Sequence, residues 1–307
     1  MALMTFSVIR VRFYASGSEA LLEPVQESPR TPLRRGRRLA VAAAVLVGAV
    51  ALVGGGVAIA DTPQPSIKTK TPRSESDVTN IDIIRQQIKN YYGDPLGTGT
   101  FGVDSNYAKE AKSVASAGGS YLAKPYHGKK TKAILLDVDD TSLNTWNYEI
   151  ASNFAYNPTV NATFVTGQQF PAVPGMVDLA KAAATEGYAI FFLTGRPAAQ
   201  EAATLGNLTA DGTGVDAGYP KPTTLGNGED GLFTKPAVAD YPAYLKTACA
   251  ADPSGTCTTI HYKSATRAHI ESLGYDIVAN FGDQYSDLKG GYADRTFKLP
   301  NPTYYLP

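Results

Sequence analysis

The sequence has few residues that bind transition metals and no overall excess of charge of either sign. Its 307 residues include two Cys and three His, with 28 basic and 28 acidic residues. The histidines, His127, His261 and His269, are not clustered, so we assign none of them to catalysis. No second Cys or His pair stands at a suitable spacing from the two cysteines, which argues against a zinc site. No repeat of solenoid or propeller length is visible.

The charges are unevenly distributed along the chain. Residues 1–60 contain seven Arg and three Glu, whereas residues 61–307 contain 21 basic and 25 acidic residues. A mildly acidic body lacks the basic patch with which proteins bind the phosphates of nucleic acids. We therefore expect no nucleic-acid partner. The sequence leaves the oligomeric state open.

The positive charge near the N-terminus belongs to an export pattern. Four arginines between residues 34 and 38 precede an uncharged run at 39–60, which ends in the small-x-small sequence A-I-A. This order of basic, apolar and cleavage segments is typical of a signal peptide. The run is also about as long as a membrane-spanning helix, so a retained anchor is the alternative. We expect residues 1–60 to be a tail and signal peptide, and the mature protein to be secreted or held in the cell envelope. It meets a membrane only if 39–60 is retained.

The rest of the chain reads as a linker followed by a single domain. Residues 61–79 are rich in Pro, Thr, Ser and Lys without hydrophobic periodicity, which predicts a flexible linker. Residues 80–307 have the pattern of one folded domain. Within it, Cys249 and Cys257 lie in a loop rich in Pro, Gly and Asp. In an exported protein such a pair usually forms a disulfide, with two free thiols as the alternative.

Helical and strand patterns alternate along this domain. Amphipathic periodicity and capping residues predict helices at 81–91, 104–122, 175–187, 197–208 and 264–273. Short apolar or β-branched runs predict strands at 133–136, 188–193, 258–262 and 277–281. This alternation predicts an α/β fold, a Rossmann-like, mostly parallel sheet with helices on both faces. Ligands of such sheets bind beyond the carboxyl ends of the strands.

Two polar motifs follow the first two predicted strands. The first, D-V-D-D-T-S, begins at Asp137 and places three acids in four positions. Like charges this close raise one another's pKa unless a cation holds them, although a polar turn is the alternative. The second motif, L-T-G-R-P, contains Thr194 and Gly195. A hydroxyl and a Gly amide before a helix suit a phosphate oxygen, although Thr is also a routine helix cap.

Two further polar groups follow the later predicted strands. Lys263 comes after the predicted strand at 258–262, where an ammonium would neutralise phosphate, although most lysines are simply solvated. The motif G-D-Q-Y-S-D supplies Asp283 and Asp287, whose carboxylate oxygens are ligands that Mg²⁺ prefers. A helix cap at Asp283 is the alternative. Together the four motifs are far more specific than any one of them.

In this order and spacing the motifs resemble those of the haloacid dehalogenase superfamily. The chain looks most like its acid phosphatase branch, which includes plant vegetative storage proteins and bacterial class B and class C acid phosphatases. The resemblance extends from about Ile81 to the C-terminus. Its further segments are Y-Y-G-D-P at 91–95, D-S-N-Y-A at 104–108, P-A-V-P-G at 171–175 and R-T-F-K-L-P-N-P-T-Y-Y at 295–305.

The resemblance implies a role for each motif residue. Asp137 would be the nucleophile that forms an aspartyl-phosphate, and Asp139 would protonate the leaving oxygen and then activate water. Thr194, Gly195 and Lys263 would bind the phosphoryl oxygens. A Mg²⁺ cofactor would be held by Asp137, the backbone carbonyl of Asp139, Asp283 and Asp287, the last directly or through water. The expected substrate is a small phosphomonoester.

Three questions stay open at this level. Residues 143–174 are rich in aromatics and form either a small cap over the site or a structural loop packed on the core. The protein is expected to be an exported, Mg²⁺-dependent acid phosphatase. A phosphotransferase that uses an alcohol acceptor, or a catalytically weak storage or binding relative, is the alternative. Arg196 either contacts substrate or caps a helix.

Overall fold

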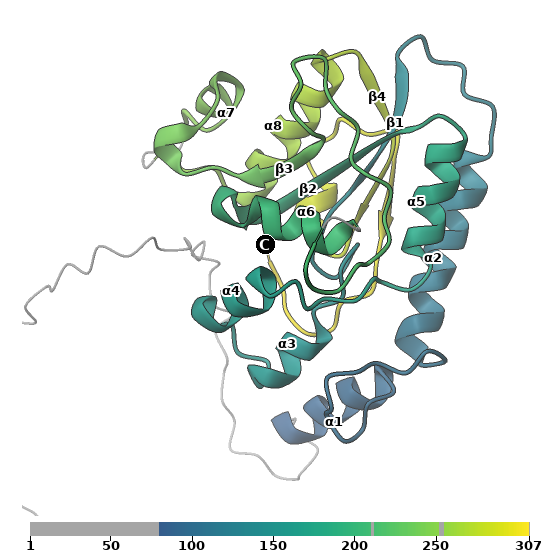
Figure 1. Cartoon of the computed structure of the whole chain (residues 1–307), viewed down its shortest axis with the longest axis vertical. Helices are drawn as coiled ribbons and strands as arrows, with labels where there is room; N and C mark the ends of the chain where they lie inside the picture. The colour runs from purple at the N-terminus through teal and green to yellow at the C-terminus, as the bar shows by residue number, and fades with distance from the viewer. Residues whose placement is uncertain (1–79, 210–211, 252–254, 307) are drawn as a thin grey trace, which may run out of the picture. The chain divides into compact units, whose positions relative to one another are not determined.

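Parallel strands form the centre of the protein, in a five-stranded sheet with the order β3-β2-β1-β4-β5 (Figure 1). The computed structural model describes residues 80–209, 212–251 and 255–306, all within one compact unit of the chain. The predicted signal or anchor segment at 1–60 and linker at 61–79 lie outside the described residues. The strands are β1 (Thr131–Leu136), β2 (Ala189–Pro197), β3 (Leu232–Lys235), β4 (Tyr275–Gly282) and β5 (Arg295–Lys298).

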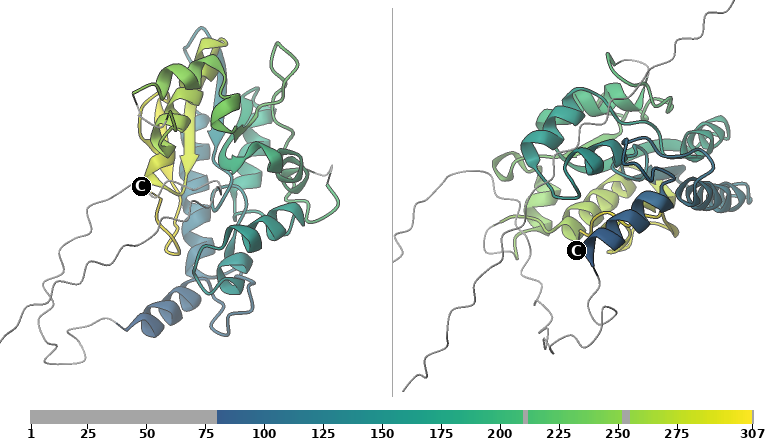
Figure 2. Two further views of the ribbon diagram at one scale, coloured as in Figure 1. Left: turned by 90° about the vertical axis from the view of Figure 1, so that its left-hand side faces the viewer. Right: turned by 90° about the horizontal axis from the view of Figure 1, so that it is seen from below.

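Helices cover both faces of this sheet (Figures 1 and 2). They are α1 (Ile81–Tyr91), α2 (Asn106–Leu122), α3 (Trp146–Ala151), α4 (Pro158–Thr166), α5 (Met176–Thr185), α6 (Glu201–Leu208), α7 (Ala243–Ala248), α8 (Thr259–Ser272) and α9 (Tyr285–Leu288). No helix among the described residues is long and apolar enough to cross a membrane. The predicted α/β class, with a parallel sheet between helices, is confirmed.

The alternation of side chains along β1 explains the two layers of helices. Ile134 and Leu136 pack in one buried cluster with residues of α2 and α5. Ala133 and Leu135 point to the opposite face and pack with residues of α7 and α8, including Leu245. Successive strand residues point to opposite faces, so an uninterrupted apolar run is what a strand buried on both faces requires.

One predicted strand is wrong. Residues 258–262 are not a strand but the start of α8, whose N-cap is Thr258. The Thr258 hydroxyl accepts a hydrogen bond from the backbone N–H of His261 (3.2 Å). The β-branched pair Thr258-Thr259 suggested a strand, but Tyr262, Thr266 and Ile270 recur every four residues and are buried on one face of the helix. Helical packing outweighs the local strand propensity here.

Smaller differences concern the ends of elements. The short strands β3 and β5 were not predicted. The N-cap of α2 is Ser105 rather than Asp104, and its side chain accepts from the Ala108 N–H. Pro197 ends β2, and a 3-10 turn separates it from α6.

The aromatic residues at 143–174 pack largely against the protein interior. The Trp146 ring stacks on Tyr92, with ring centroids 4.1 Å apart, and its Nε1 donates to Asp94 (2.9 Å). Phe170 is fully buried, whereas Tyr156 is exposed. The segment forms α3 and α4, which lie next to each other (Figure 1). Most of its aromatics therefore act as core residues, and a capping role stays a prediction.

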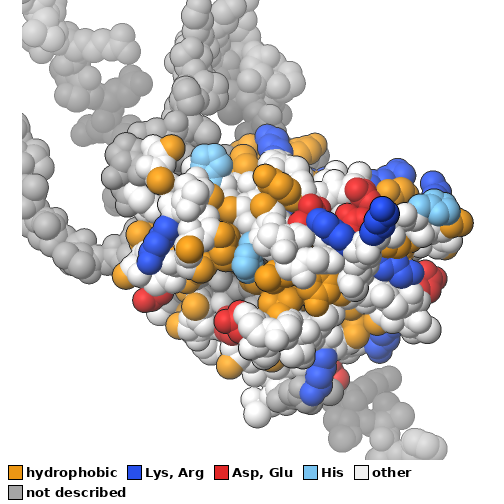
Figure 3. Space-filling view, turned by 90° about the horizontal axis from the view of Figure 1, so that it is seen from above, with side chains coloured by type: hydrophobic (Ala, Val, Ile, Leu, Met, Phe, Trp, Pro, Cys, Tyr) orange, Lys and Arg blue, Asp and Glu red, His pale blue; other side chains and the backbone are white. Residues whose placement is uncertain are grey.

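The face of the described residues that Figure 3 shows has no continuous stripe of basic side chains. On the face of the described residues drawn in Figure 3, Lys and Arg side chains are scattered among acidic, apolar and other side chains. This distribution agrees with the mildly acidic composition of residues 61–307.

Cys249 and Cys257 are joined in a disulfide, as predicted, and the two Cα atoms are 5.0 Å apart. Both residues are buried and belong to the core cluster on the α7 and α8 face. Cross-linking a loop this short stabilises a fold by about 2–3 kcal/mol through the entropy of the unfolded chain. We expect a double Cys→Ser variant to lose about that much free energy of unfolding, measured by urea denaturation. Mass spectrometry without reductant should find the pair linked, and two free thiols would contradict it.

Candidate active site

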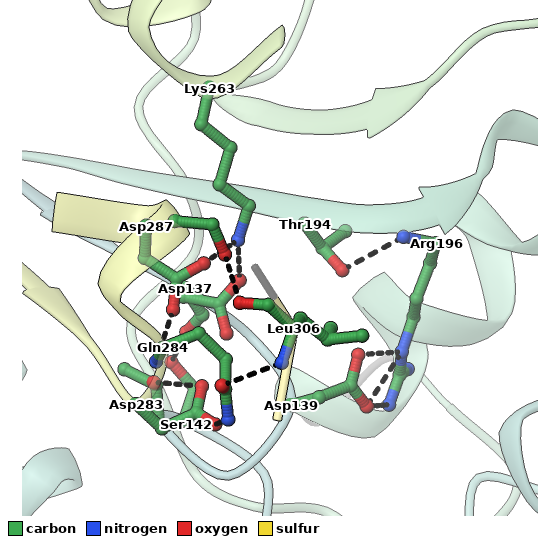
Figure 4. A network of polar contacts seen from close by, with 12 residues as sticks. Asp137, Asp139, Ser142, Thr194, Arg196, Lys263, Asp283, Gln284, Asp287 and Leu306 are labelled. Atoms are coloured by element: carbon green, nitrogen blue, oxygen red, sulfur yellow. Dashed lines mark hydrogen bonds and ion pairs between the residues drawn. The ribbon is translucent and has the colours of Figure 1, made fainter. Parts of the chain in front are cut away.

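The residues of the four sequence motifs converge at the carboxyl end of the sheet (Figure 4). Asp137 follows β1, Thr194 lies near the end of β2, and Asp283 follows β4. Neighbouring parallel strands end at one edge, so motifs that are far apart in sequence meet there. Asp287 reaches the same place from α9.

The turn after β1 is built from local hydrogen bonds. The N–H groups of Ser142 and Leu143 both donate to the carbonyl of Val138 (2.9 and 2.8 Å), and Asp140 adopts a left-handed φ of 51°. The Asp140 carboxylate accepts from the N–H and the hydroxyl of Thr145 (3.0 and 2.5 Å). Of the three acids in this motif, Asp140 therefore stabilises the turn. Asp137 and Asp139 do not take part in these turn contacts.

Lys263 reaches the site from α8 and not from a strand end, which corrects its predicted position. Its Nζ contacts the carboxylates of Asp137 and Asp287, the latter at 2.5 Å. α8 precedes β4 and runs antiparallel to it, so its N-terminal turns lie at the carboxyl edge of the sheet. All three side chains are buried. Although burial alone would lower it, the two carboxylates raise the pKa of Lys263 above its usual value, so the side chain is an ammonium.

Three buried carboxylates lie close together, and Lys263 contacts two of them, those of Asp137 and Asp287. Oxygen atoms of Asp137, Asp283 and Asp287 lie within 4.8 Å of one another. Burial and the charge of Asp287 raise the pKa of Asp137 well above its usual range, and the same two causes raise that of Asp283 to about 7. When all three acids are ionised, two negative charges are left uncompensated by Lys263. A hard divalent cation would supply the missing positive charge, so this donor set fits Mg²⁺.

A shell of hydrogen bonds orients the acids after β4. Asp283 Oδ2 accepts from the side-chain amides of Gln284 and Asn301 (both 2.7 Å), and its Oδ1 accepts from the Thr141 hydroxyl (3.2 Å). Asp287 Oδ2 accepts from the Gln284 N–H (2.8 Å). Such outer contacts fix the carboxylates in the orientation that a metal ion needs.

Arg267 fixes the loop that carries Asp287. Its guanidinium is fully buried and donates to the backbone carbonyls of Asp287 (2.6 Å), Lys289 and Gly291 (2.7 Å). It lies four residues after Lys263, on the same face of α8. That spacing was visible in the sequence, but the carbonyls to which Arg267 donates are 20 to 24 residues away.

The second motif contributes a buried hydroxyl and an open stretch of backbone. The Thr194 side chain accepts from the Arg196 N–H (3.1 Å), which leaves the hydroxyl proton available to another acceptor. A Cβ atom placed on Gly195 would meet nothing within 4 Å. An anion would therefore find room beside the Gly195 backbone.

Arg196 binds Asp139, a contact that the sequence did not predict. Nη2 lies 2.7 Å from Asp139 Oδ1, and Nε lies 3.1 Å from Oδ2. Nη1 also donates to the Thr204 hydroxyl of α6 (3.1 Å). The arginine is buried, whereas the Asp139 side chain is 29% exposed. This forked pair fixes Asp139 at the mouth of the site.

The C-terminal segment passes close to the same site. The backbone N–H of Leu306 donates to Gln284 Oε1 (3.0 Å), and the Ser286 hydroxyl donates to the Leu306 carbonyl (3.3 Å). Figure 4 shows Leu306 beside the cluster of acids. Gln284 therefore links the C-terminal segment to the Asp283 carboxylate.

Comparison with known proteins agrees with this geometry. Residues 63–307 match the family described as HAD superfamily, subfamily IIIB (Acid phosphatase). The stem 28 kDa glycoprotein of Glycine max is 31% identical over 185 residues, which are 59% of this chain and 61% of the glycoprotein. The chain thus matches less than two thirds of the length of this relative. Acid phosphatase 1 of Solanum lycopersicum is 28% identical over 210 residues, 66% of this chain and 71% of that protein.

The solved structure of the class C acid phosphatase from Bacillus anthracis has the same fold. It superposes with a TM-score of 0.51 at 20% identity, over 72% of this chain and 86% of that one. The resemblance predicted from the motifs is thus confirmed. The chain belongs to the HAD superfamily, subfamily IIIB, the acid phosphatase family.

Proposed function

We propose that the protein hydrolyses small phosphomonoesters through a covalent phosphate on Asp137. The observation that carries the proposal is the cluster of Asp137, Lys263, Asp283 and Asp287 at the carboxyl end of a parallel sheet, with Asp139 and Thr194 beside it. The family of the chain supports the same reaction.

The first half of the reaction uses two carboxyl groups. A carboxylate oxygen of Asp137 attacks phosphorus, the bond from phosphorus to the ester oxygen breaks, and Asp139 gives its proton to the leaving oxygen. In the second half, Asp139 takes a proton from water, which attacks the phosphorus of the aspartyl-phosphate. The bond from phosphorus to the Asp137 oxygen breaks, which releases inorganic phosphate and regenerates the Asp137 carboxylate. The forked contact with Arg196 holds Asp139 in one orientation. Because such a pair favours the ionised carboxylate, it supports the base role of the second half more directly than the acid role of the first.

Three groups are suited to bind the phosphoryl oxygens. The Thr194 hydroxyl and the Gly195 N–H would donate to them, and the Lys263 ammonium would offset their charge. The open space beside Gly195 supports this role.

We also propose Mg²⁺ as the cofactor, held by Asp137, Asp283, Asp287 and the backbone carbonyl of Asp139. When bound, the ion would neutralise negative charge on both the nucleophile and the phosphate, which would otherwise repel each other. The charge that Lys263 leaves uncompensated supports a divalent ion at this position.

Export is proposed from the sequence pattern at 34–60, with cleavage before Asp61. N-terminal sequencing and fractionation of the expressed protein would distinguish cleavage from retention as an anchor.

We expect the purified protein to hydrolyse p-nitrophenyl phosphate with Mg²⁺ and to lose most of this activity in EDTA, with recovery when Mg²⁺ is added in excess. The reason is that chelation leaves the acids of the site without their counter-charge. Activity that is unaffected by EDTA would contradict the metal-dependent proposal. The pH of highest activity follows from repeating the assay between pH 4 and 8.

The same assay separates the alternatives. Formation of a new phosphoester when an alcohol is added would favour a phosphotransferase. No turnover of a phosphoester panel at any pH would favour a storage or binding relative.

A further inference from the structure

Two side-chain amides converge on one oxygen of Asp283, an arrangement that the proposed mechanism does not use. Gln284 Nε2 and Asn301 Nδ2 each lie 2.7 Å from Asp283 Oδ2. Gln284 follows β4 and Asn301 follows β5, so two separate segments of the chain supply these donors. A carboxylate oxygen can accept about two hydrogen bonds. The acceptor capacity of Oδ2 is therefore filled by the protein itself.

The orientation of both amides is fixed by their oxygen atoms. Gln284 Oε1 accepts from the backbone N–H of Leu306 (3.0 Å). Asn301 Oδ1 accepts from the N–H and the hydroxyl of Thr303 (2.9 and 2.6 Å). An amide whose oxygen is held by a backbone N–H must turn its NH₂ group to the other side. Each amide therefore faces Asp283 as a donor.

The second oxygen of Asp283 is more available than the first. Among the described residues, Oδ1 accepts only from the Thr141 hydroxyl, at 3.2 Å. Gln284 also engages Asp287, because its backbone N–H donates to Asp287 Oδ2 (2.8 Å), while Asp287 Oδ1 contacts Lys263 (2.5 Å). Gln284 thus occupies one oxygen of each of the two acids that follow β4.

The number of carboxylate oxygens that a site offers distinguishes two hard cations. Ca²⁺ takes about six to eight oxygen ligands and can bind both oxygens of one carboxylate, whereas the smaller Mg²⁺ takes about six at shorter distances. We infer that Gln284 and Asn301 are positioning residues that favour Mg²⁺ over Ca²⁺, because they leave Asp283 with one available oxygen. This inference rests on the proposed function, in which Asp283 is a metal ligand.

The test measures the binding of the two ions and does not depend on catalysis. MgCl₂ and CaCl₂ are titrated separately into the metal-free, full-length protein by isothermal titration calorimetry at one pH. The quantity compared is the Kd for Ca²⁺ divided by the Kd for Mg²⁺. Loss of groups that orient a metal ligand changes metal affinity by about 10–100-fold. In Gln284→Met/Asn301→Leu we expect the ratio to fall by roughly tenfold or more, because Asp283 can then offer both oxygens to the larger ion.

Single variants and a remote control separate this role from a general effect of substitution. Gln284→Met and Asn301→Leu should each give part of the combined fall, since each leaves one amide on Asp283 Oδ2. Gln87→Met makes the same chemical change at an exposed position on α1 and should leave the ratio unchanged. The Tm in EDTA shows whether each variant is folded. Asn301 is only half-buried, so Asn301→Leu still provides the test if the Gln284 variants do not fold.

Two results would overturn the inference. One is an unchanged ratio in every folded variant. The other is an equal loss of affinity for both ions, because the amides would then support the site without selecting between the ions.

Hydrolysis of p-nitrophenyl phosphate, assayed on the same samples, separates this inference from the proposed function. If the ratio falls as expected but no ester is hydrolysed, the role of Gln284 and Asn301 stands and the proposed function fails. If the enzyme is active and the ratio does not change, the function stands and the inference is wrong. A wild-type protein that binds neither ion would overturn the inference together with the Mg²⁺ proposal.

Discussion

Asp137→Asn is expected to lower kcat for p-nitrophenyl phosphate by a factor on the order of 10⁴ or more. The amide is nearly the same size as the carboxylate, but it is a poor nucleophile and a weaker ligand for a hard cation. The change also removes one of three clustered buried carboxylates, two of which contact Lys263, so the fold should not be destabilised. A large loss of activity with an unchanged or higher Tm is therefore the expected combination.

Trapping the intermediate would test the role of Asp137 directly. Acid quenching during turnover, followed by mass spectrometry, should find one phosphoryl group on the peptide that contains Asp137, and none in Asp137→Asn. The matched control is Asp178→Asn, which makes the same chemical change at an exposed position on α5. Wild-type turnover by Asp137→Asn, or phosphate on another residue, would show that the nucleophile is misassigned.

Lys263→Met is expected to affect both stability and activity. The ammonium contacts the two buried carboxylates of Asp137 and Asp287, and removal of one partner from a buried ion pair typically costs about 3–5 kcal/mol. In EDTA we expect the free energy of unfolding to fall by about that amount, measured by urea denaturation. Added Mg²⁺ should restore much of it, because a cation that binds only the folded state stabilises that state. Activity should fall by roughly 10²-fold or more, because the proposed donor to the phosphate is lost.

The stability of the metal-free protein should fall as the pH rises. The pKa of Asp283 is raised from 3.8 to about 7 in the folded protein, so the folded state binds that proton more tightly than the unfolded state. Metal-free protein therefore loses stability as pH rises from about 4 to about 7 and not below that window. In Lys263→Met this loss should be steeper. Lys246→Met, at an exposed position on α7, provides the control. Equal stability of Lys263→Met and this control in EDTA would contradict the prediction.

The sequence predicted the central strands well because they are buried on both faces. β1 and β2 carry uninterrupted apolar runs, and in β4 only Asn280 interrupts one, which leaves little choice of structure. β3 and β5 have only four residues each and alternate or are partly exposed, so no run marks them. The start of α8 was misread because local β-propensity and tertiary packing disagree there.

The sequence predicted which residues meet at the candidate site, but not the contacts that hold them there. Lys263 was predicted to lie at this edge of the sheet because it followed a predicted strand. It does lie there, but it belongs to the helix α8. The pair between Arg196 and Asp139 joins residues 57 apart, and the contact between Asn301 and Asp283 joins residues 18 apart. No local pattern encodes such contacts, because they arise only when the chain is folded.

The contact between Asn301 and Asp283 also determines how far the C-terminus of the protein can be shortened without changing the site. A version that stopped at Leu299 would retain all five strands and each of the residues to which we assign chemistry. It would nevertheless lose the Asn301 amide, as well as the Leu306 N–H that Gln284 accepts, and Gln284 is the other amide donor to Asp283. Trimming by secondary structure alone would thus remove contacts that orient Asp283, the proposed metal ligand. The last residues are better treated as part of the site than as a dispensable tail.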